Sequence, residues 1–220
     1  MLRDLGYVPS RNASPTVQSD VPIVFVVDDD ISVRESLELL IQAEGWRPGL
    51  CETAAEFLAR PAPKVPNCLI LDVNLPVLNG LDLQQIIAER SETPIIFVTG
   101  YGDVPTSVKA MKAGALEFLT KPFDHGALLS AVQQALDRSR STLAFQSDLH
   151  SLQERYQSLS RRERQVMSLV VSGLMNKQVG FELGISEITV KAHRGQVMRK
   201  MGAKSLPDLI SKADKLGVER

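Results

Sequence analysis

The chain has 220 residues, of which 44% are hydrophobic and 23% are charged, and its formal net charge is −1. This length leaves room for two ordinary domains with packed cores. No apolar run approaches the ~20 residues of a membrane helix, and residues 1–20 lack the apolar stretch of a signal peptide, so we expect a cytoplasmic protein without a membrane partner.

The charges are divided unevenly along the chain. Residues 1–150 contain 12 Lys and Arg against 19 Asp and Glu, whereas residues 151–220 contain 13 against 7. Only the basic C-terminal part is therefore expected to bind a polyanion. Cys51 and Cys68 form no metal-binding pair, and we interpret them as core thiols.

In chain order, residues 1–20 show little apolar periodicity and are predicted to be a disordered lead. Short apolar runs bounded by turn residues then predict four strands, at residues 23–27, 68–71, 94–98 and 116–120, and a further strand is expected near residues 47–51. Helical apolar spacing lies between them, which predicts an α/β fold with a doubly wound parallel sheet. Pro48 cannot donate to a strand ladder, so the second strand is expected at the edge, as in the flavodoxin-like order 2-1-3-4-5.

Chemically active side chains follow four of these strands. Asp28 and Asp29 follow the first strand, Asp72 follows the third, Thr99 the fourth and Lys121 the fifth. Parallel strands bring such groups to one edge of the sheet. Clustered carboxylates repel one another unless a cation joins them, and hard oxygen ligands suit Mg²⁺. The pattern therefore predicts a magnesium site for phosphoryl transfer onto Asp72.

Residues 21–140 resemble the receiver domain of two-component response regulators. The resemblance implies that Asp72 accepts the phosphoryl group and that Lys121–Pro122 is a cis peptide bond. It implies Mg²⁺ ligands at Asp28, Asp29, Asp72 and the carbonyl oxygen of Asn74. It also implies three switch residues, of which Thr99 and Lys121 bind the phosphoryl oxygens and Phe118 is the switch aromatic.

Two residues beside this site carry further expectations. The glycine-rich loop around Tyr101 is predicted to be flexible and to let Thr99 move, and the alternative is an ordinary loop that leads into the next helix. The side chains of Asn74 and Tyr101 flank the acceptor and are expected to influence the lifetime of the phosphoryl group. Asn74 also bears on an alternative, because haloacid-dehalogenase-like phosphatases carry a second Asp two residues after the nucleophile, where this chain has Asn74.

The helix predicted from about residue 124 to 138 leads into a linker. Leu149, Leu152, Tyr156 and Leu159 are spaced 3, 4 and 3 residues apart, which predicts an amphipathic helical linker over residues 139–158. Two interpretations stay open. The apolar stripe packs on its own chain, or it forms a dimer seam or signalling stalk.

Four short helices are predicted in the basic part. Ser160 and Glu163 form a capping-box pattern, residues 176–183 form a second helix closed by Gly184, and Ser186 and Ser205 can cap the third and fourth helices. The second and third helices, joined by residues 184–186, predict a helix-turn-helix. Gly180 lies inside the second helix and is expected to cost roughly 0.5–1 kcal/mol of local stability.

The third helix is expected to bind DNA by one face. Val190, His193, Val197 and Met201 are predicted to face inward, with His193 partly buried. The opposite face can enter a major groove, where Lys191 can reach guanine acceptors. The predicted DNA-contacting residues are Ser186, Thr189, Lys191, Ala192, Arg194, Gly195 and Arg199.

Residues 159–216 resemble the LuxR-type output domain, and the whole chain resembles FixJ-like response regulators. We therefore expect a receiver at residues 21–138, the linker, and an all-α DNA-binding domain at residues 159–220. The resemblance implies a non-enzymatic transcriptional regulator that is phosphorylated by a sensor histidine kinase, dimerises and binds double-stranded promoter DNA, with RNA polymerase as a further partner. Two alternative functions stay open, a phosphatase-like enzyme and an adaptor that is not switched by phosphorylation. For the switching mechanism, the alternative to dimerisation is relief of an inhibitory contact between the receiver and the output domain.

Overall fold

The computed structural model describes residues 21–90, 93–100 and 104–218, and the chain divides into two compact units, Met1–Arg140 and Ser141–Arg220. The predicted disordered lead and Tyr101 in the predicted flexible loop lie outside the described residues. Within the described part, no helix is both long and apolar enough to cross a membrane.

The first unit contains a five-stranded parallel sheet in the order β2-β1-β3-β4-β5. The strands are β1 Ile23–Val27, β2 Arg47–Cys51, β3 Asn67–Leu71, β4 Ile95–Thr99 and β5 Glu117–Thr120. Pro48 lies in the edge strand β2, as predicted, and every residue of the central strands β3 and β4 is buried. The predicted doubly wound α/β fold is confirmed.

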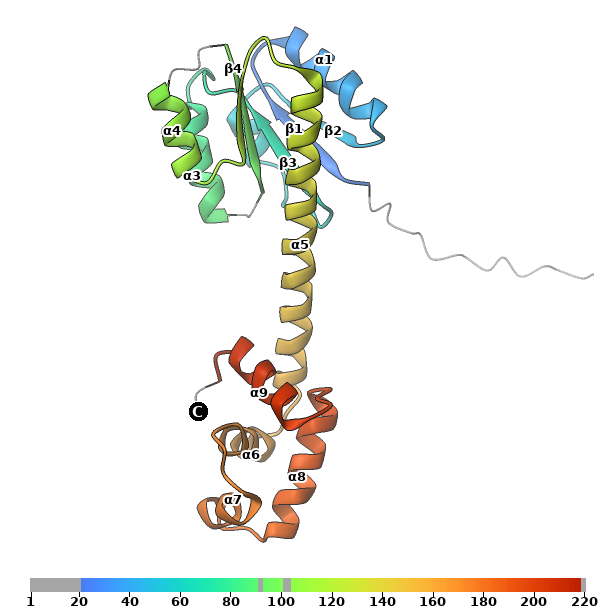
Figure 1. The fold of residues 1–220 in the computed structure, drawn as a ribbon, viewed down its shortest axis with the longest axis vertical. Coiled ribbons are helices and arrows are strands. Elements are labelled where there is room, and N and C mark those ends of the chain that lie inside the picture. The colour runs from blue at the N-terminus through green and yellow to red at the C-terminus, as the bar shows by residue number, and fades with distance from the viewer. Residues whose placement is uncertain (1–20, 91–92, 101–103, 219–220) are drawn as a thin grey trace, which may run out of the picture. The chain divides into compact units, whose positions relative to one another are not determined.

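Helices cover both faces of this sheet (Figure 1). They are α1 Ile31–Ala43, α2 Ala54–Leu58, α3 Gly80–Arg90, α4 Val104–Lys112 and the start of α5 His125–Gln157. Successive strand side chains point to opposite faces. In β1, Val27 packs in a core with α2, α3 and α4, whereas Val26 packs with α1 and α5.

Helix α5 continues without interruption for 33 residues, so the predicted linker is helical. Its C-terminal part contributes to the core of the second unit, where Leu152 is buried and Tyr156 is partly buried beside Leu159. In the structure, three of the four residues of the stripe, Leu152, Tyr156 and Leu159, therefore pack on their own chain, as in the first of the two interpretations.

The second unit contains four further helices, α6 Arg161–Val171, α7 Asn176–Leu183, α8 Glu187–Lys200 and α9 Leu206–Lys215. Ser160, Ser186 and Ser205 cap α6, α8 and α9 through their side chains, as predicted. Gly184 ends α7 in the left-handed region, with φ of 63°. Helices α7 and α8 form the predicted helix-turn-helix.

Gly180 has a packing role that its helix propensity does not reveal. Its carbonyl oxygen accepts a hydrogen bond from the backbone N–H of Ile185 at 3.0 Å. A Cβ at this position would lie 2.8 Å from the carbonyl oxygen of Ile185. The missing side chain therefore lets the turn between α7 and α8 fold closely onto α7.

Candidate functional site

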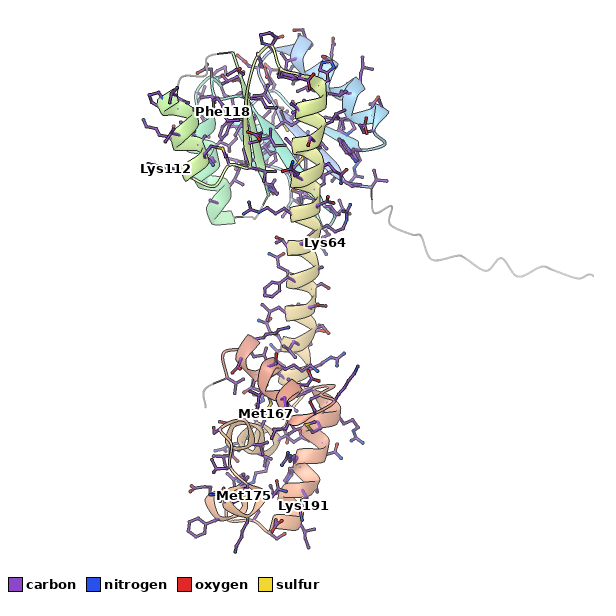
Figure 2. The ribbon with its side chains drawn as sticks, in the orientation of Figure 1. Lys64, Lys112, Phe118, Met167, Met175 and Lys191 are labelled. Atoms are coloured by element: carbon purple, nitrogen blue, oxygen red, sulfur yellow. The ribbon has the colours of Figure 1, made fainter. Side chains whose placement is uncertain are left out.

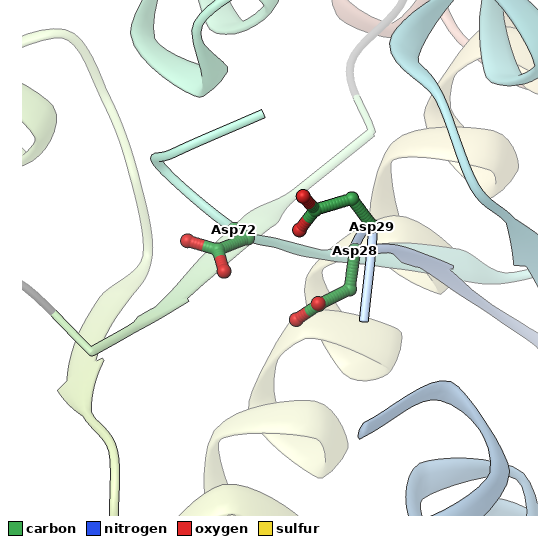
Figure 3. Close-up of side chains that lie close together, drawn as sticks. All are labelled: Asp28, Asp29 and Asp72. Carbon is green, nitrogen blue, oxygen red and sulfur yellow. The ribbon is translucent and has the colours of Figure 1, made fainter. Parts of the chain in front are cut away.

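The acidic site forms where β1 and β3 end side by side. Val27 pairs with Leu71 in the sheet, and the backbone N–H of Asp72 donates to the carbonyl oxygen of Val27 at 2.9 Å. This register brings Asp28 next to Asp72. Carboxylate oxygens of Asp28, Asp29 and Asp72 lie within 4.8 Å of one another (Figure 3).

Lys121 joins two of these acids across the sheet. Its backbone N–H donates to the carbonyl oxygen of Thr99 at 2.8 Å, which places the residue at the same sheet edge. Its Nζ donates to Oδ2 of Asp28 at 2.6 Å and to Oδ2 of Asp72 at 3.0 Å. The peptide bond to the following proline is cis, as expected.

Burial and this ion pairing act in opposite directions on the titration of the site. Burial raises the pKa of Asp28 above its ordinary value of 3.8, although the hydrogen bond from Lys121 opposes the shift. Burial lowers the pKa of Lys121, but hydrogen bonds to Asp28 and Asp72 outweigh it, and the net pKa is above the ordinary 10.5. The ammonium therefore stays charged at neutral pH and compensates the buried acids.

Backbone groups fix the orientation of both buried carboxylates. Oδ1 of Asp28 accepts from the backbone N–H of Asp30, and Oδ1 of Asp72 accepts from that of Asn74, each at 3.0 Å. Arg34 was not predicted to belong here, yet its guanidinium donates to the carbonyl oxygen of Asp28 at 2.7 Å. Arg34 could have been predicted from the sequence, because it lies one turn into the helix that follows Asp28 and Asp29.

Gly80 limits the path of the loop that follows Asp72. Its backbone N–H donates to the carbonyl oxygen of Val73 at 2.9 Å. A Cβ at this position would collide with the carbonyl oxygen of Asp72. The first residue of α3 therefore has to be a glycine, because it lies directly against the backbone of Asp72.

The remaining residues predicted for this site differ in their surroundings. Thr99 is completely buried at the end of β4. Phe118 on β5 is partly buried, and its ring centroid lies 6.0 Å from that of Phe97. Asn74 is exposed, and the role of its carbonyl oxygen as a metal ligand stays a prediction.

The donor set suits a divalent cation. All three side chains offer carboxylate oxygens, which hard cations prefer, and the exposed Asp29 leaves one side open to water. Two of the three carboxylates already bind a cationic group, the ammonium of Lys121. The site therefore stabilises positive charge, as a magnesium site must.

The predicted DNA-binding helix, α8, has the expected inward and outward faces. Val190, Val197 and Met201 are buried, and His193 is partly buried. The exposed residues of the predicted DNA-contacting set are Ser186, Lys191, Ala192, Gly195 and Arg199. Figure 2 labels Lys191 among the side chains of α8.

Three predicted DNA-contacting side chains also hold the unit together. Arg194 is partly buried and donates to Oδ1 of Asn176 on α7 at 3.1 Å. Oγ of Ser186 accepts the backbone N–H of Thr189, and the two hydroxyl oxygens are 2.8 Å apart. The DNA contacts of these three side chains stay predictions, because each side chain would have to share or give up its present hydrogen bond in order to contact DNA.

Lys191 forms only an exposed ion pair within its own helix. Its Nζ lies 3.0 Å from a carboxylate oxygen of Glu187, and both side chains are about half exposed. Exposed pairs of this kind contribute roughly 0–1 kcal/mol, so the lysine can exchange its partner for a nucleic acid acceptor at little cost.

Comparison with known proteins agrees with both units. Residues 24–133 match the family model described as the response regulator receiver domain, and residues 157–213 match that of the bacterial regulatory proteins of the luxR family. Nodulation protein W of Bradyrhizobium diazoefficiens is 49% identical over 204 residues, which cover 92% of this chain and 90% of that protein.

Other relatives also match along most of their length. The transcriptional regulatory protein FixJ of Azorhizobium caulinodans is 42% identical over 196 residues, covering 89% of this chain and 93% of that protein. The solved structure of the response regulator StyR aligns with a TM-score of 0.79 and 43% identity, over 89% of this chain and 99% of that one. The chain therefore belongs to the two-component response regulators with a receiver domain and a LuxR-type DNA-binding domain, a family of phosphorylation-dependent regulators of transcription.

Proposed function

We propose that Asp72 accepts a phosphoryl group from a sensor histidine kinase and that this modification increases promoter binding by the C-terminal unit. The observation that carries the proposal is the position of the Asp72 carboxylate, beside two further acids and 3.0 Å from the ammonium of Lys121. Asp72 is 8% exposed, so a donor can reach it only at the sheet edge.

The chemistry is a displacement at phosphorus. A carboxylate oxygen of Asp72 attacks the phosphorus of a phosphohistidine, the P–O bond forms, and the P–N bond breaks as its electron pair returns to the imidazole. Mg²⁺, when bound, supplies positive charge to the phosphoryl oxygens, and its proposed ligands are Asp28, Asp29, Asp72 and the carbonyl of Asn74.

Lys121 is the residue whose partners change in this reaction. Before it, the ammonium binds the carboxylates of Asp28 and Asp72. An acyl phosphate carries more negative charge than the carboxylate that it replaces, so the ammonium gains by moving to a phosphoryl oxygen. The hydroxyl of Thr99 supplies a second donor from β4.

The register of β4 and β5 links this movement to a surface. Thr99 pairs with Thr120, and Phe97 pairs with Phe118, whose ring it contacts. A shift of Thr99 therefore disturbs the packing beneath the face formed by α4 and β5. We assign phosphorylation-dependent homodimerisation to this face, and RNA polymerase is the further proposed partner of the promoter-bound protein.

Substitution of Asp72 tests the assignment. The parent chain, treated with a small phosphodonor and Mg²⁺, is expected to gain one phosphoryl group, detected by intact-mass spectrometry, and Asp72→Asn none. Asp82→Asn, which changes an exposed acid on α3, is the matched control and should be modified like the parent. Equal modification of Asp72→Asn would overturn the assignment, and turnover of many donor equivalents would favour a phosphatase.

A further inference from the structure

Ile188 is an apolar residue in an unexpected place. It is the second residue of α8 and is 80% exposed, although the buried residues of this helix form much of the core of the unit. A single exposed apolar residue is ordinary on a protein surface. This one, however, lies on the helix that the family uses to bind DNA.

Helical geometry places Ile188 on the DNA-binding face. Lys191, Ala192 and Gly195 follow it by 3, 4 and 7 residues, which is the spacing of one face of an α-helix. All four residues are exposed, whereas Val190, between them in the sequence, is completely buried. No described atom outside its own helical turn lies within 4 Å of a Cβ built at Gly195, so this face is open to a partner.

The N-terminal residues of a recognition helix are the ones that contact base edges. In the major groove, the 5-methyl group of thymine is the apolar feature among donors and acceptors. We propose that Ile188 reads a thymine methyl group, next to a base contacted by Lys191. In the first turns of α8, the hydroxyls of Ser186 and Thr189 lie 2.8 Å apart and can bond to each other. Ile188 is 80% exposed there, and Lys191 has an exposed ion pair with Glu187.

This inference rests on promoter binding by the C-terminal unit, and it narrows the ligand to sites with thymine at a defined position. Burying one methyl group changes an equilibrium constant about four-fold. Replacing that thymine by deoxyuridine removes the methyl group and leaves every hydrogen-bonding atom of the base in place. The parent chain is therefore expected to bind the deoxyuridine site about four-fold more weakly for each half-site changed.

The experiment is a double-mutant cycle between protein and DNA. A binding site is selected from random duplexes with the full chain, with and without phosphodonor, and each thymine of the site is then replaced in turn by deoxyuridine. Ile188→Ala is expected to bind the thymine and deoxyuridine forms of one position equally well. Phe181→Ala removes an 87% exposed side chain from α7 and should keep the parent's preference.

The outcomes separate this inference from the proposed function. A parent chain that selects no site would overturn promoter binding and the inference with it. A parent chain that selects a site but is insensitive to every deoxyuridine replacement would overturn the inference alone. So would an Ile188→Ala variant that keeps the full sensitivity, since the methyl effect would then arise from DNA shape or another residue.

Discussion

At the acidic site, the ammonium of Lys121 neutralises carboxylates that burial would otherwise make costly. Asp28 is 2% exposed and Asp72 is 8% exposed, and the lysine contacts both. Removing one partner of such a buried pair leaves an uncompensated charge. The residue therefore has two roles, since it stabilises the unphosphorylated site and is the proposed ligand of the phosphoryl group.

Lys121→Met is expected to make the site depend on Mg²⁺. Without the metal the variant should lose about 1–3 kcal/mol of unfolding free energy, less than for a fully buried pair because the Lys121 side chain is 23% exposed. Thermal unfolding should show a larger stabilisation by Mg²⁺ in the variant than in the parent. Lys112→Met, which changes an exposed lysine of α4, should respond like the parent. Equal Mg²⁺ effects in all three proteins would show that the metal and the ammonium use different carboxylates.

At the level of elements, Glu163 connects the start of α6 to the end of α8. Its carboxylate accepts the backbone N–H of Ser160 at 2.7 Å and completes the capping box. The same oxygen accepts from Nζ of Lys200 at 2.7 Å, and that lysine also donates to the carbonyl oxygen of Ser158 at 3.2 Å. The cap of α6 therefore also holds the C-terminal end of α8.

The ion pair gives this connection a pH dependence. The hydrogen bond from Lys200 holds the pKa of Glu163 below its ordinary value of 4.5. A lowered folded pKa means that the stabilisation is present above 4.5 and is lost as the pH falls through the folded value. Glu163→Gln keeps an acceptor for the capping box but loses the charge.

Hydrogen exchange of α6 and α8 can measure this effect. At pH 7 the amides of both helices should exchange faster in Glu163→Gln than in the parent, and the difference should shrink as the pH falls below about 4.5. Glu182→Gln, which changes an exposed acid on α7, should exchange like the parent at both pH values. A difference between parent and Glu163→Gln that is independent of pH would assign the effect to packing instead of charge.

For the whole molecule, α4 presents an apolar stripe suited to pairing of receivers. Val104, Val108 and Met111 are 76%, 43% and 44% exposed and are spaced 4 and 3 residues apart, which places them on one helix face. Pairing of two chains would place two recognition helices on half-sites about 34 Å apart. The second contact would then form at a high effective concentration without any new base contact.

Val108→Glu is expected to separate phosphorylation from DNA binding. A charge in the middle of the stripe should block pairing, because a buried unpaired carboxylate is costly, while Asp72 is still modified. Light scattering should find a monomer after phosphodonor treatment, and affinity for a two-half-site duplex should fall by about 10²-fold or more. Leu39→Glu alters a 70% exposed residue of α1 and is the control for a surface charge. If phosphorylated Val108→Glu binds that duplex like the parent, relief of an inhibitory contact is the better account of the switch.

The sequence alone determined the elements and their order. Apolar periodicity located the strands, Pro48 indicated the edge of the sheet, and Ser160, Gly184 and Ser186 marked helix ends that the structure confirms. These signals are local, because a period of two or of 3.6 residues and a capping side chain act within one or two turns of chain. The family resemblance added roles for Asp72 and its neighbours, which stay predictions for the individual residues.

The tertiary structure decided which side chains meet. Lys121 reaches Asp28 across 93 positions of sequence, Arg34 binds the carbonyl of Asp28, and Arg194 binds Asn176 on the preceding helix. From the sequence alone, the apolar stripe around Leu152 was equally compatible with a dimer seam. The structure shows that Leu152 is buried in the core of its own unit. Periodicity shows that a face is apolar or charged but does not name its partner, because the partner depends on the register of the sheet and the packing of distant segments.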